Sequence, residues 1–401
     1  MTNAIPSAAT NGSARTWNLV FAASFLGLSA WTLIADLRHE AHFLLQTSLS
    51  SLFLGLFISG WMVVATLYAA LPKRFILGAA AISTSRLAFG WPLLERMDLR
   101  SACLVLDLLL AVLAGIYLVT ALRDATLAGR PNFHWRHCLA MSVAGVLALI
   151  VSLPVNYLGL VHLIHDLSAG YVRLSPQGVD LQERIFMKDG RHVHLVGMAH
   201  IGDRSFYETL NRNIASPAEG RRLVLVEGVS DAQSLLPESF ASGEIYGSFA
   251  AKLGLIDQAV GFDARPNPRN EADSIDDWTE AGVDFRRADI DIQELSPEHR
   301  SRLVALLSSL EQVNLADMFK LPDDMTAMEF QDLIVQGLLK QRNDRLMEIF
   351  AESAGDYTEI FIPWGAAHLP DLERRVIALG YKPVKETSRR IIDFASLLRR
   401  S

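Results

Sequence analysis

The chain has 401 residues, of which 50% are apolar and 20% charged, and its formal net charge is −7. The high apolar fraction excludes a disordered chain, and the length is sufficient for two domains. Residues 1–170 contain ten basic and seven acidic side chains, which leaves 27 basic and 37 acidic side chains in the remainder. Because phosphate binding needs a basic surface, this acidic remainder argues against nucleic acid as a partner.

Four N-terminal segments are apolar over about the ~20 residues that a helix needs to cross a bilayer. A fifth segment, residues 75–94, is weaker because Arg86 lies near its middle. We therefore expect residues 1–166 to form an α-helical membrane region of four or five spans, with the lipid bilayer as a partner. The four strong segments are residues 17–37, 48–71, 101–122 and 138–163.

The distribution of lysine and arginine between the predicted loops indicates an orientation. With five spans and the N-terminus inside, six basic residues fall in inner loops and three in outer loops. The positive-inside rule then places the C-terminal half outside. The prediction is an integral membrane protein, in a bacterial inner membrane, whose C-terminal domain lies on the periplasmic face.

Residues 167–401 have shorter apolar runs and more charges, which predicts an α/β domain with a mixed sheet flanked by helices. A hairpin is expected at residues 183–196, around the turn Asp189–Gly190. The unbroken apolar run at residues 222–226 predicts a strand buried on both faces. Later elements are expected to be strands at 285–292 and 358–362, helices at 297–312, 326–354 and 370–379, and an amphipathic helix after Lys385.

A Gly-x-Ala-His unit occurs twice, each time after an apolar strand, at residues 197–200 and 365–368. Glu227 ends a third apolar strand in the same way. Gly197 and Gly365 would allow the backbone to approach a ligand closely. His200, His368 and Glu227 could together hold a divalent metal ion with positions left for water, or form an acid/base cluster without metal.

These motifs resemble the TraB/PrgY family, which includes the Tiki metalloproteases, and are more distantly similar to erythromycin esterases and ChaN-type haem-binding proteins. The hallmarks of the family match the two Gly-x-x-His motifs, Glu227, and Arg342–Asn343 on a late helix. Gln341 stands where the family usually has an acidic residue. The resemblance implies an α/β domain with the site at the strand ends, and metal-dependent peptide cleavage. Arg342 would stabilise an oxyanion and Asn343 would orient a peptide group.

The leading functional hypothesis is a membrane-anchored hydrolase that depends on a divalent metal ion and acts on peptides or proteins. A second hypothesis is a signalling module that sequesters a peptide or another ligand without turnover. A third is haem capture by the histidines, in the manner of the ChaN-type proteins. Glu227 distinguishes the first from the third, because hydrolysis at a metal needs a carboxylate near both histidines and haem ligation does not.

Overall fold

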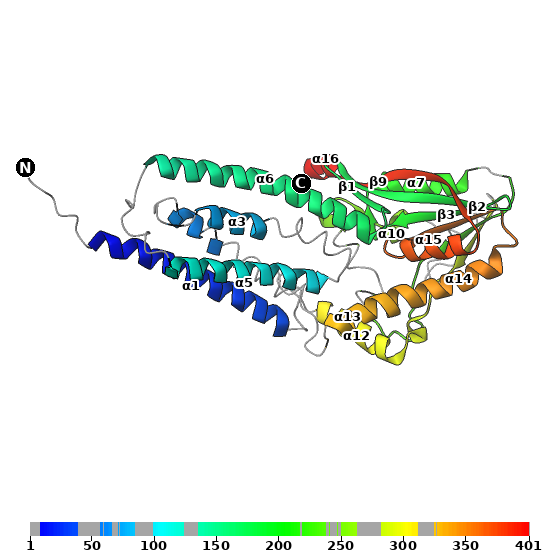
Figure 1. Cartoon of the computed structure of the whole chain (residues 1–401). Coiled ribbons are helices and arrows are strands. Elements are labelled where there is room, and N and C mark those ends of the chain that lie inside the picture. The colour runs from blue at the N-terminus through cyan, green and yellow to red at the C-terminus, as the bar shows by residue number, and fades with distance from the viewer. Residues whose placement is uncertain are drawn as a thin grey trace, which may run out of the picture. The chain divides into compact units, whose positions relative to one another are not determined.

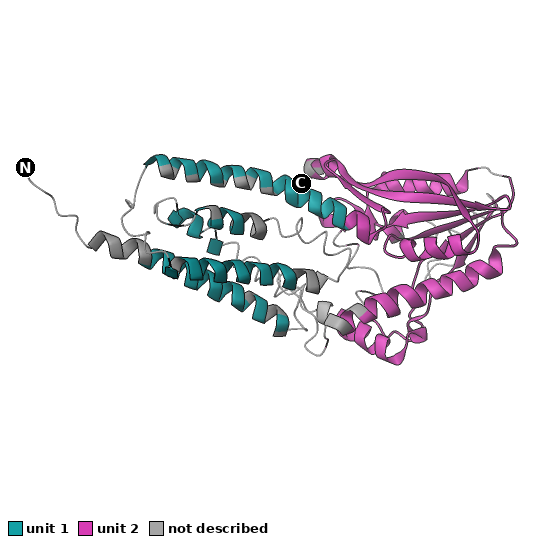
Figure 2. Cartoon of the chain, in the orientation of Figure 1, with its two compact units in different colours: residues 1–163 teal, residues 164–401 magenta. Residues whose placement is uncertain are grey.

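A computed structural model describes the chain in separate stretches, which fall into two compact units, residues 1–163 and 164–401 (Figure 2). The described residues are 9–38, 73–84, 99–123, 135–216, 219–237, 250–262, 282–311 and 327–400, with short pieces between 57 and 71 and single residues at 240, 247 and 325.

The first unit is helical where it is described, with α1 (Ala9–Arg38), α3 (Lys73–Thr84), α5 (Leu99–Arg123) and the long α6 (Trp135–Leu167) (Figure 1). Its core is an aromatic cluster in which the Phe21 ring lies 4.9 Å from that of Trp61, centroid to centroid. Polar groups are also buried here. Tyr117 donates a hydrogen bond to Asn18, and Asp107 is completely buried.

The predicted membrane spans are not supported, and this part of the predicted fold class is wrong. Within the described residues, no helix combines the length and the apolar character that crossing a bilayer requires. Some of the apolar side chains that the prediction counted, among them Phe21, Phe25 and Leu110, pack against one another, and the predicted segments also contain buried polar residues, namely Asn18, Ser29 and Asp107. The predicted inner-membrane location and periplasmic orientation rested on those spans and are corrected with them.

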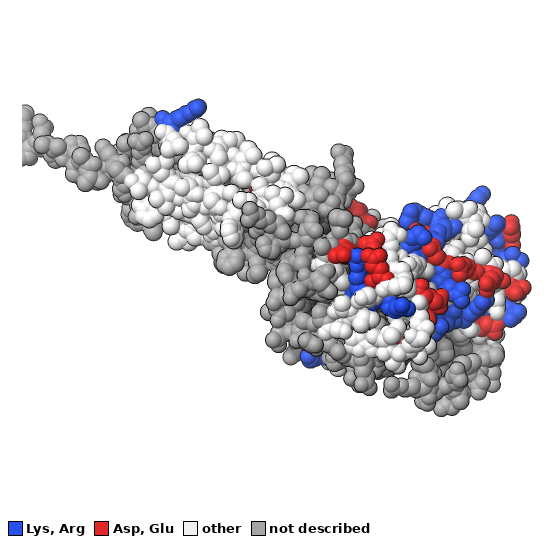
Figure 3. Space-filling model, turned by 90° about the horizontal axis from the view of Figure 1, so that it is seen from below, with Lys and Arg blue, Asp and Glu red and all other residues white. Residues whose placement is uncertain are grey.

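Charged side chains gather on the second unit. In the face that Figure 3 shows, almost all the visible blue and red atoms belong to residues 164–401. This unit holds the strands β1 (Val172–Ser175), β2 (Gly178–Lys188), β3 (Arg191–Met198), β4 (Ile201–Gly202), β5 (Arg222–Val226), β6 (Ile256–Asp257), β7 (Val283–Arg287), β8 (Glu359–Gly365) and β9 (Lys382–Asp393).

The main helices of this unit are α7 (Arg204–Ala215), α12 (Pro297–Glu311), α14 (Arg342–Ser353) and α15 (Leu369–Ala378). Shorter ones are α10 (Gln258–Gly261), α13 (Ala327–Asp332), α16 (Phe394–Arg400) and the 3₁₀ turn η2 (Ile292–Glu294). Between α13 and α14 lies a π-helical stretch, η3 (Leu333–Gln341), so that the three form one continuous helix.

Seven of the described strands form one mixed sheet, in the order β1-β2-β3-β8-β5-β7, with β9 paired to β2. The strands β3, β8, β5 and β7 are parallel, whereas β1, β2 and β9 pair antiparallel. The mixed sheet flanked by helices, which the sequence predicted for this region, is therefore present. Strands β4 and β6 form a separate two-stranded pair.

Both faces of the sheet are covered, because alternate residues of its central strands point into two different cores. Leu223 and Leu225 of β5 pack with α14 and α15, and Val224 and Val226 pack with α7. All five residues of β5 are buried. The prediction that residues 222–226 form a strand buried on both faces is confirmed.

The end of the chain differs from its prediction. The helix expected after Lys385 is instead strand β9, which pairs with β2 from Lys382 to Asp393, and only residues after it are helical. In the second half of β9, exposed side chains alternate with less exposed ones, and Ile391 is buried. The pairing with β2 satisfies the backbone groups of a long strand edge, and a helix there would leave that edge open.

The four parallel strands bring their carboxyl ends to one edge of the sheet. In spatial order, β3 leads to His200, β8 to His368, β5 to Glu227 and β7 to Asp289. This edge is where open α/β sheets usually place ligands, and it contains the candidate site.

Candidate functional site

The centre of the site is a buried arginine between two carboxylates. Arg342, the first residue of α14, donates from Nη2 to Glu227 Oε1 at 2.8 Å and to Asp289 Oδ2 at 2.7 Å. Its Nε donates to Asp289 Oδ1 at 2.9 Å, so that Asp289 is held by two nitrogens of the guanidinium. The planar guanidinium is suited to such a paired contact.

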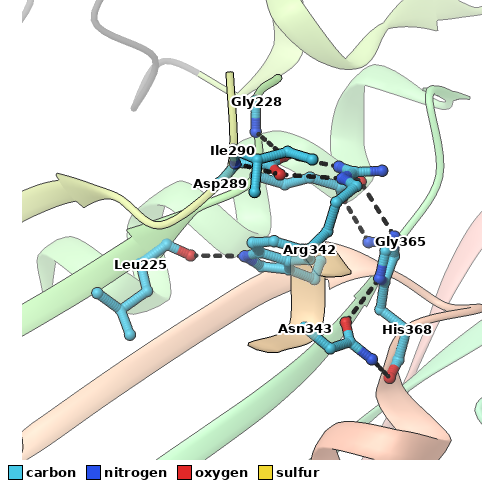
Figure 4. Close-up of polar contacts among 10 residues, drawn as sticks. Leu225, Gly228, Asp289, Ile290, Arg342, Asn343, Gly365 and His368 are labelled. Carbon is cyan, nitrogen blue, oxygen red and sulfur yellow. Dashed lines mark hydrogen bonds and ion pairs between the residues drawn. The ribbon is translucent and has the colours of Figure 1, made fainter. Parts of the chain in front are cut away.

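Backbone amides complete the hydrogen bonding of both carboxylates, as Figure 4 shows for Asp289. Gly365 N–H donates to Glu227 Oε2 at 2.6 Å, while Gly228 and Ile290 N–H groups each donate to Asp289 at 2.9 Å. Each carboxylate is therefore held by a guanidinium and by the backbone. The three charged groups together carry a net charge of −1, and their side chains are almost completely buried.

His368 is fixed by a chain of hydrogen bonds on the other side of the site. Its Nδ1 lies 2.7 Å from Asn343 Oδ1, and Asn343 Nδ2 donates to Asp371 Oδ2 at 2.9 Å (Figure 4 shows the first contact). Because the Asn343 oxygen can only accept, Nδ1 of His368 carries the hydrogen in the neutral ring. Its Nε2 then has a lone pair, and this atom lies 3.8 Å from Glu227 Oε1.

The indole ring of Trp364 packs against both Arg342 and His368. Trp364, completely buried in β8, lies 5.4 Å from the Arg342 guanidinium carbon, measured to the ring centroid, and 5.0 Å from the His368 ring. Its Nε1–H donates to Leu225 O at 3.0 Å, which fixes the ring against β5. Arg342 is therefore in cation–π contact as well as ion-paired.

The charges of the site shift the titration of its members. Burial and the Arg342 guanidinium lower the pKa of His368 to about 4. Burial raises the pKa of Glu227, but the Arg342 guanidinium, the histidines His368 and His200, and the Gly365 N–H outweigh it, and the pKa lies below its usual value. Burial alone would lower the pKa of Arg342, but Asp289 and Glu227 raise it above its usual value. At neutral pH His368 is neutral, and Glu227 and Arg342 are charged.

The low pKa of His368 makes the stability of the folded protein sensitive to acid. In the unfolded chain the imidazole binds a proton near pH 6.5, whereas in the folded protein it does so near pH 4. The unfolded state therefore binds more protons in this interval, and the free energy of unfolding falls as the pH falls from 6.5 to 4. Between pH 6.5 and pH 4, we expect the free energy of unfolding of the wild type to fall by about 3 kcal/mol more than that of His368→Asn.

Urea unfolding at a series of pH values measures this difference. The comparison with His368→Asn removes the contributions that other groups make to the pH dependence of both proteins. If the free energy of unfolding changed equally with pH in the two proteins between pH 6.5 and 4, His368 would not be held neutral.

The structure brings together four of the seven residues that the sequence singled out, and the backbone amide of a fifth. Arg342 contacts Glu227, Asn343 contacts His368, and His368 lies beside Glu227, while Gly365 joins them through its N–H. His200 is exposed at the end of β3, where its charge would favour the ionised form of Glu227. Gly197 lies inside β3 and is pressed against β2, where an added Cβ would lie 3.0 Å from Gln182 O.

The donor set does not fit the divalent metal ion that the motifs suggested. Both oxygens of Glu227 already accept hydrogen bonds, one from the Arg342 guanidinium and one from Gly365 N–H. A cation bound there would meet the positive charge of Arg342 at the same oxygen. Over the stretches of chain that the structure describes, no three His, Cys, Asp or Glu side chains are grouped so that they could hold a metal ion.

Two further residues of the site were not found from the sequence. Asp289 was placed inside an expected strand at 285–292, but β7 ends at Arg287, which leaves Asp289 at the strand end beside Glu227. Asp371, in the first turn of α15, holds the amide of Asn343. The first, Asp289, lacks the signal that marked Glu227, because β7 contains Asp284, Arg286 and Arg287 rather than an unbroken apolar run. The second had no signal beyond its position three residues after His368.

Comparisons with known proteins give no further identification. No protein-family model, no curated protein and no solved structure matches this chain.

Proposed function

We propose that residues 164–401 form a hydrolase domain that cleaves peptide bonds at the Glu227–Arg342–His368 site. The observation that carries the proposal is the state of His368, which is buried, neutral and oriented by Asn343, with the lone pair of Nε2 next to a carboxylate. A neutral, oriented imidazole is the usual general base for the activation of water. The peptide as substrate comes from the resemblance to the TraB/PrgY family.

In the proposed reaction, His368 Nε2 takes a proton from a water molecule whose oxygen attacks the scissile carbonyl carbon. The imidazolium that forms is stabilised by Glu227, whose Oε1 lies 3.8 Å from Nε2. This contact raises the pKa of His368, but burial and Arg342 outweigh it and hold that pKa at about 4. The proton then passes from Nε2 to the leaving nitrogen as the carbon–nitrogen bond breaks, which balances the hydrolysis.

Arg342 is suited to stabilise the oxyanion in this reaction. Its Nε and Nη2 hold Glu227 and Asp289, while its Nη1 makes no hydrogen bond to any residue in the described part of the chain. The held guanidinium needs no rearrangement to donate from Nη1, and such preorganised donors contribute strongly to catalysis in sites with little water. No step of the reaction passes through a metal ion.

The proposal is tested with the purified full-length chain and a library of internally quenched peptides. We expect turnover that survives addition of a chelator. We also expect kcat/KM to fall as the pH is lowered and His368 becomes protonated. Peptide binding without turnover would favour the sequestering module over the hydrolase. Turnover that a chelator abolishes and a divalent cation restores would overturn the metal-free reaction.

A further inference from the structure

The helix that carries Arg342 and Asn343 is not α-helical immediately before them. Residues Leu333–Gln341 form the π-helix η3, and α14 begins at Arg342. The π-helix is rare and is mostly found as single turns at functional sites. A stretch of nine residues therefore needs contacts that favour it over the α-helix.

One imidazole from a neighbouring helix contacts both ends of this stretch. His299 of α12 lies with its Nε2 2.9 Å from Oδ2 of Asp332, the residue before η3. Its Nδ1 lies 3.5 Å from Nε2 of Gln341, the last residue of η3. Because the Asp332 carboxylate only accepts, Nε2 of His299 carries the hydrogen, and Nδ1 accepts from Gln341.

The middle of η3 is shaped to receive the same ring. At Gly337 an added Cβ would lie 3.1 Å from Cγ of His299 and 3.3 Å from its Nδ1, which is closer than a side chain is normally accommodated. His299 is buried, and Gly337 is buried beneath it. The imidazole ring of His299 therefore packs against the backbone of Gly337, halfway along η3, and also contacts the residues at both ends of η3.

The direction of Arg342 and Asn343 depends on where the π-helix ends. A π-helix turns through a smaller angle per residue than an α-helix, because each turn contains more residues. If η3 relaxed to an α-helix, the residues after it would point to other sides of the helix axis. Arg342 has to reach Glu227 and Asp289 while the adjacent Asn343 has to reach His368 and Asp371, which requires one particular rotation of α14.

We propose that His299 is a positioning residue, which holds the π-helix η3 and thereby aims Arg342 and Asn343 at the site. Among the described residues, no hydrogen bond or ion pair joins it to either of them, and it acts through Gly337, Asp332 and Gln341. The catalytic consequence rests on the proposed function, whereas the positioning itself does not. The test therefore includes a measurement made without substrate.

Trp364 provides that measurement, because the Arg342 guanidinium lies over its ring while its indole N–H is held by Leu225 O. The chain has seven tryptophans. The indole resonance of Trp364 can therefore be assigned in the full-length chain by its loss in Trp364→Phe. Arg342→Lys gives the position that this resonance takes when the guanidinium is absent.

We expect His299→Leu to move the Trp364 resonance toward the position seen in Arg342→Lys. We also expect it to lower kcat by about 10- to 100-fold, as small misplacements of catalytic groups do, with little change in KM. Arg302→Met is the matched control. Arg302 lies on the same helix and also contacts Asp332, but it reaches only the start of the stretch, through Asp332 and Glu329. It should leave both the resonance and kcat unchanged.

Gln341→Leu removes only the contact next to Arg342, and it keeps the proposal testable if His299→Leu does not fold. It should move the resonance in the same direction. A folded His299→Leu or Gln341→Leu protein with the wild-type resonance would overturn the positioning role. A shifted resonance in a protein whose wild type hydrolyses no peptide would support the positioning role and refute the proposed function.

Discussion

Replacing Arg342 with methionine should lower the free energy of unfolding of residues 164–401 by about 3–5 kcal/mol. The change leaves Glu227 and Asp289, which are both buried, without the guanidinium that neutralises them. An uncompensated buried charge is far more destabilising than the loss of an exposed ion pair. Urea unfolding followed by circular dichroism measures the change.

Arg345→Met provides the matched control, one turn further along α14. Arg345 pairs with Glu348, and the side chains are 42% and 64% exposed. Loss of this ion pair should lower the free energy of unfolding by less than about 1 kcal/mol. Adding Glu227→Gln and Asp289→Asn to Arg342→Met should restore much of the lost stability. A single Arg342→Met protein as stable as Arg345→Met would mean that the three charges are not coupled.

The largest effect on activity is expected from His368→Asn, which should lower kcat/KM by about 10²- to 10⁴-fold, the usual contribution of a general base. The asparagine amide can still donate toward Asn343, so that the chain of hydrogen bonds to Asp371 is kept. Glu227→Gln should have a similar effect. Because both groups act in one proton transfer, the double variant should be little worse than either single variant.

His194→Asn is the control for the removal of a partly buried histidine. His194 lies in β3 with its Nδ1 2.7 Å from Glu183 Oε1, so that it is also a histidine next to a carboxylate, away from the strand ends. Its replacement should leave kcat/KM unchanged. If His194→Asn and His368→Asn lowered activity equally, the loss would reflect folding, and the site would have to be sought elsewhere.

The sequence predicted those parts of the fold that depend on local pattern. The apolar run of β5, the Asp189–Gly190 hairpin and the helix α12 each have a signal within a few residues. Glu227 and His368 were found for the same reason, since Glu227 directly follows the apolar strand β5 and His368 comes three residues after the end of β8. Their actual proximity depends on strand order, which no local pattern contains.

What the sequence could not predict depends on contacts between distant segments. Asp289 was hidden because the true end of β7 is set by its pairing with β5, which stops at Arg287. The direction of Arg342 depends on the π-helix, for which sequence periodicity gives no clear signal. The membrane prediction rested on apolar composition, whereas no helix within the described residues has both the length and the apolar character needed to cross a bilayer.

The order of the strands also sets when the domain can become complete. Strand β8 lies between β3 and β5 in the sheet, yet it follows both in the chain by more than a hundred residues. A chain that ends before Glu359 lacks the strand that joins the hairpin side of the sheet to β5 and β7. Pairings over such long sequence separations form slowly, and unpaired strand edges of the kind left before β8 arrives favour aggregation. During synthesis, the facing edges of β3 and β5 therefore stay unpaired until β8, residues Glu359–Gly365, has been made.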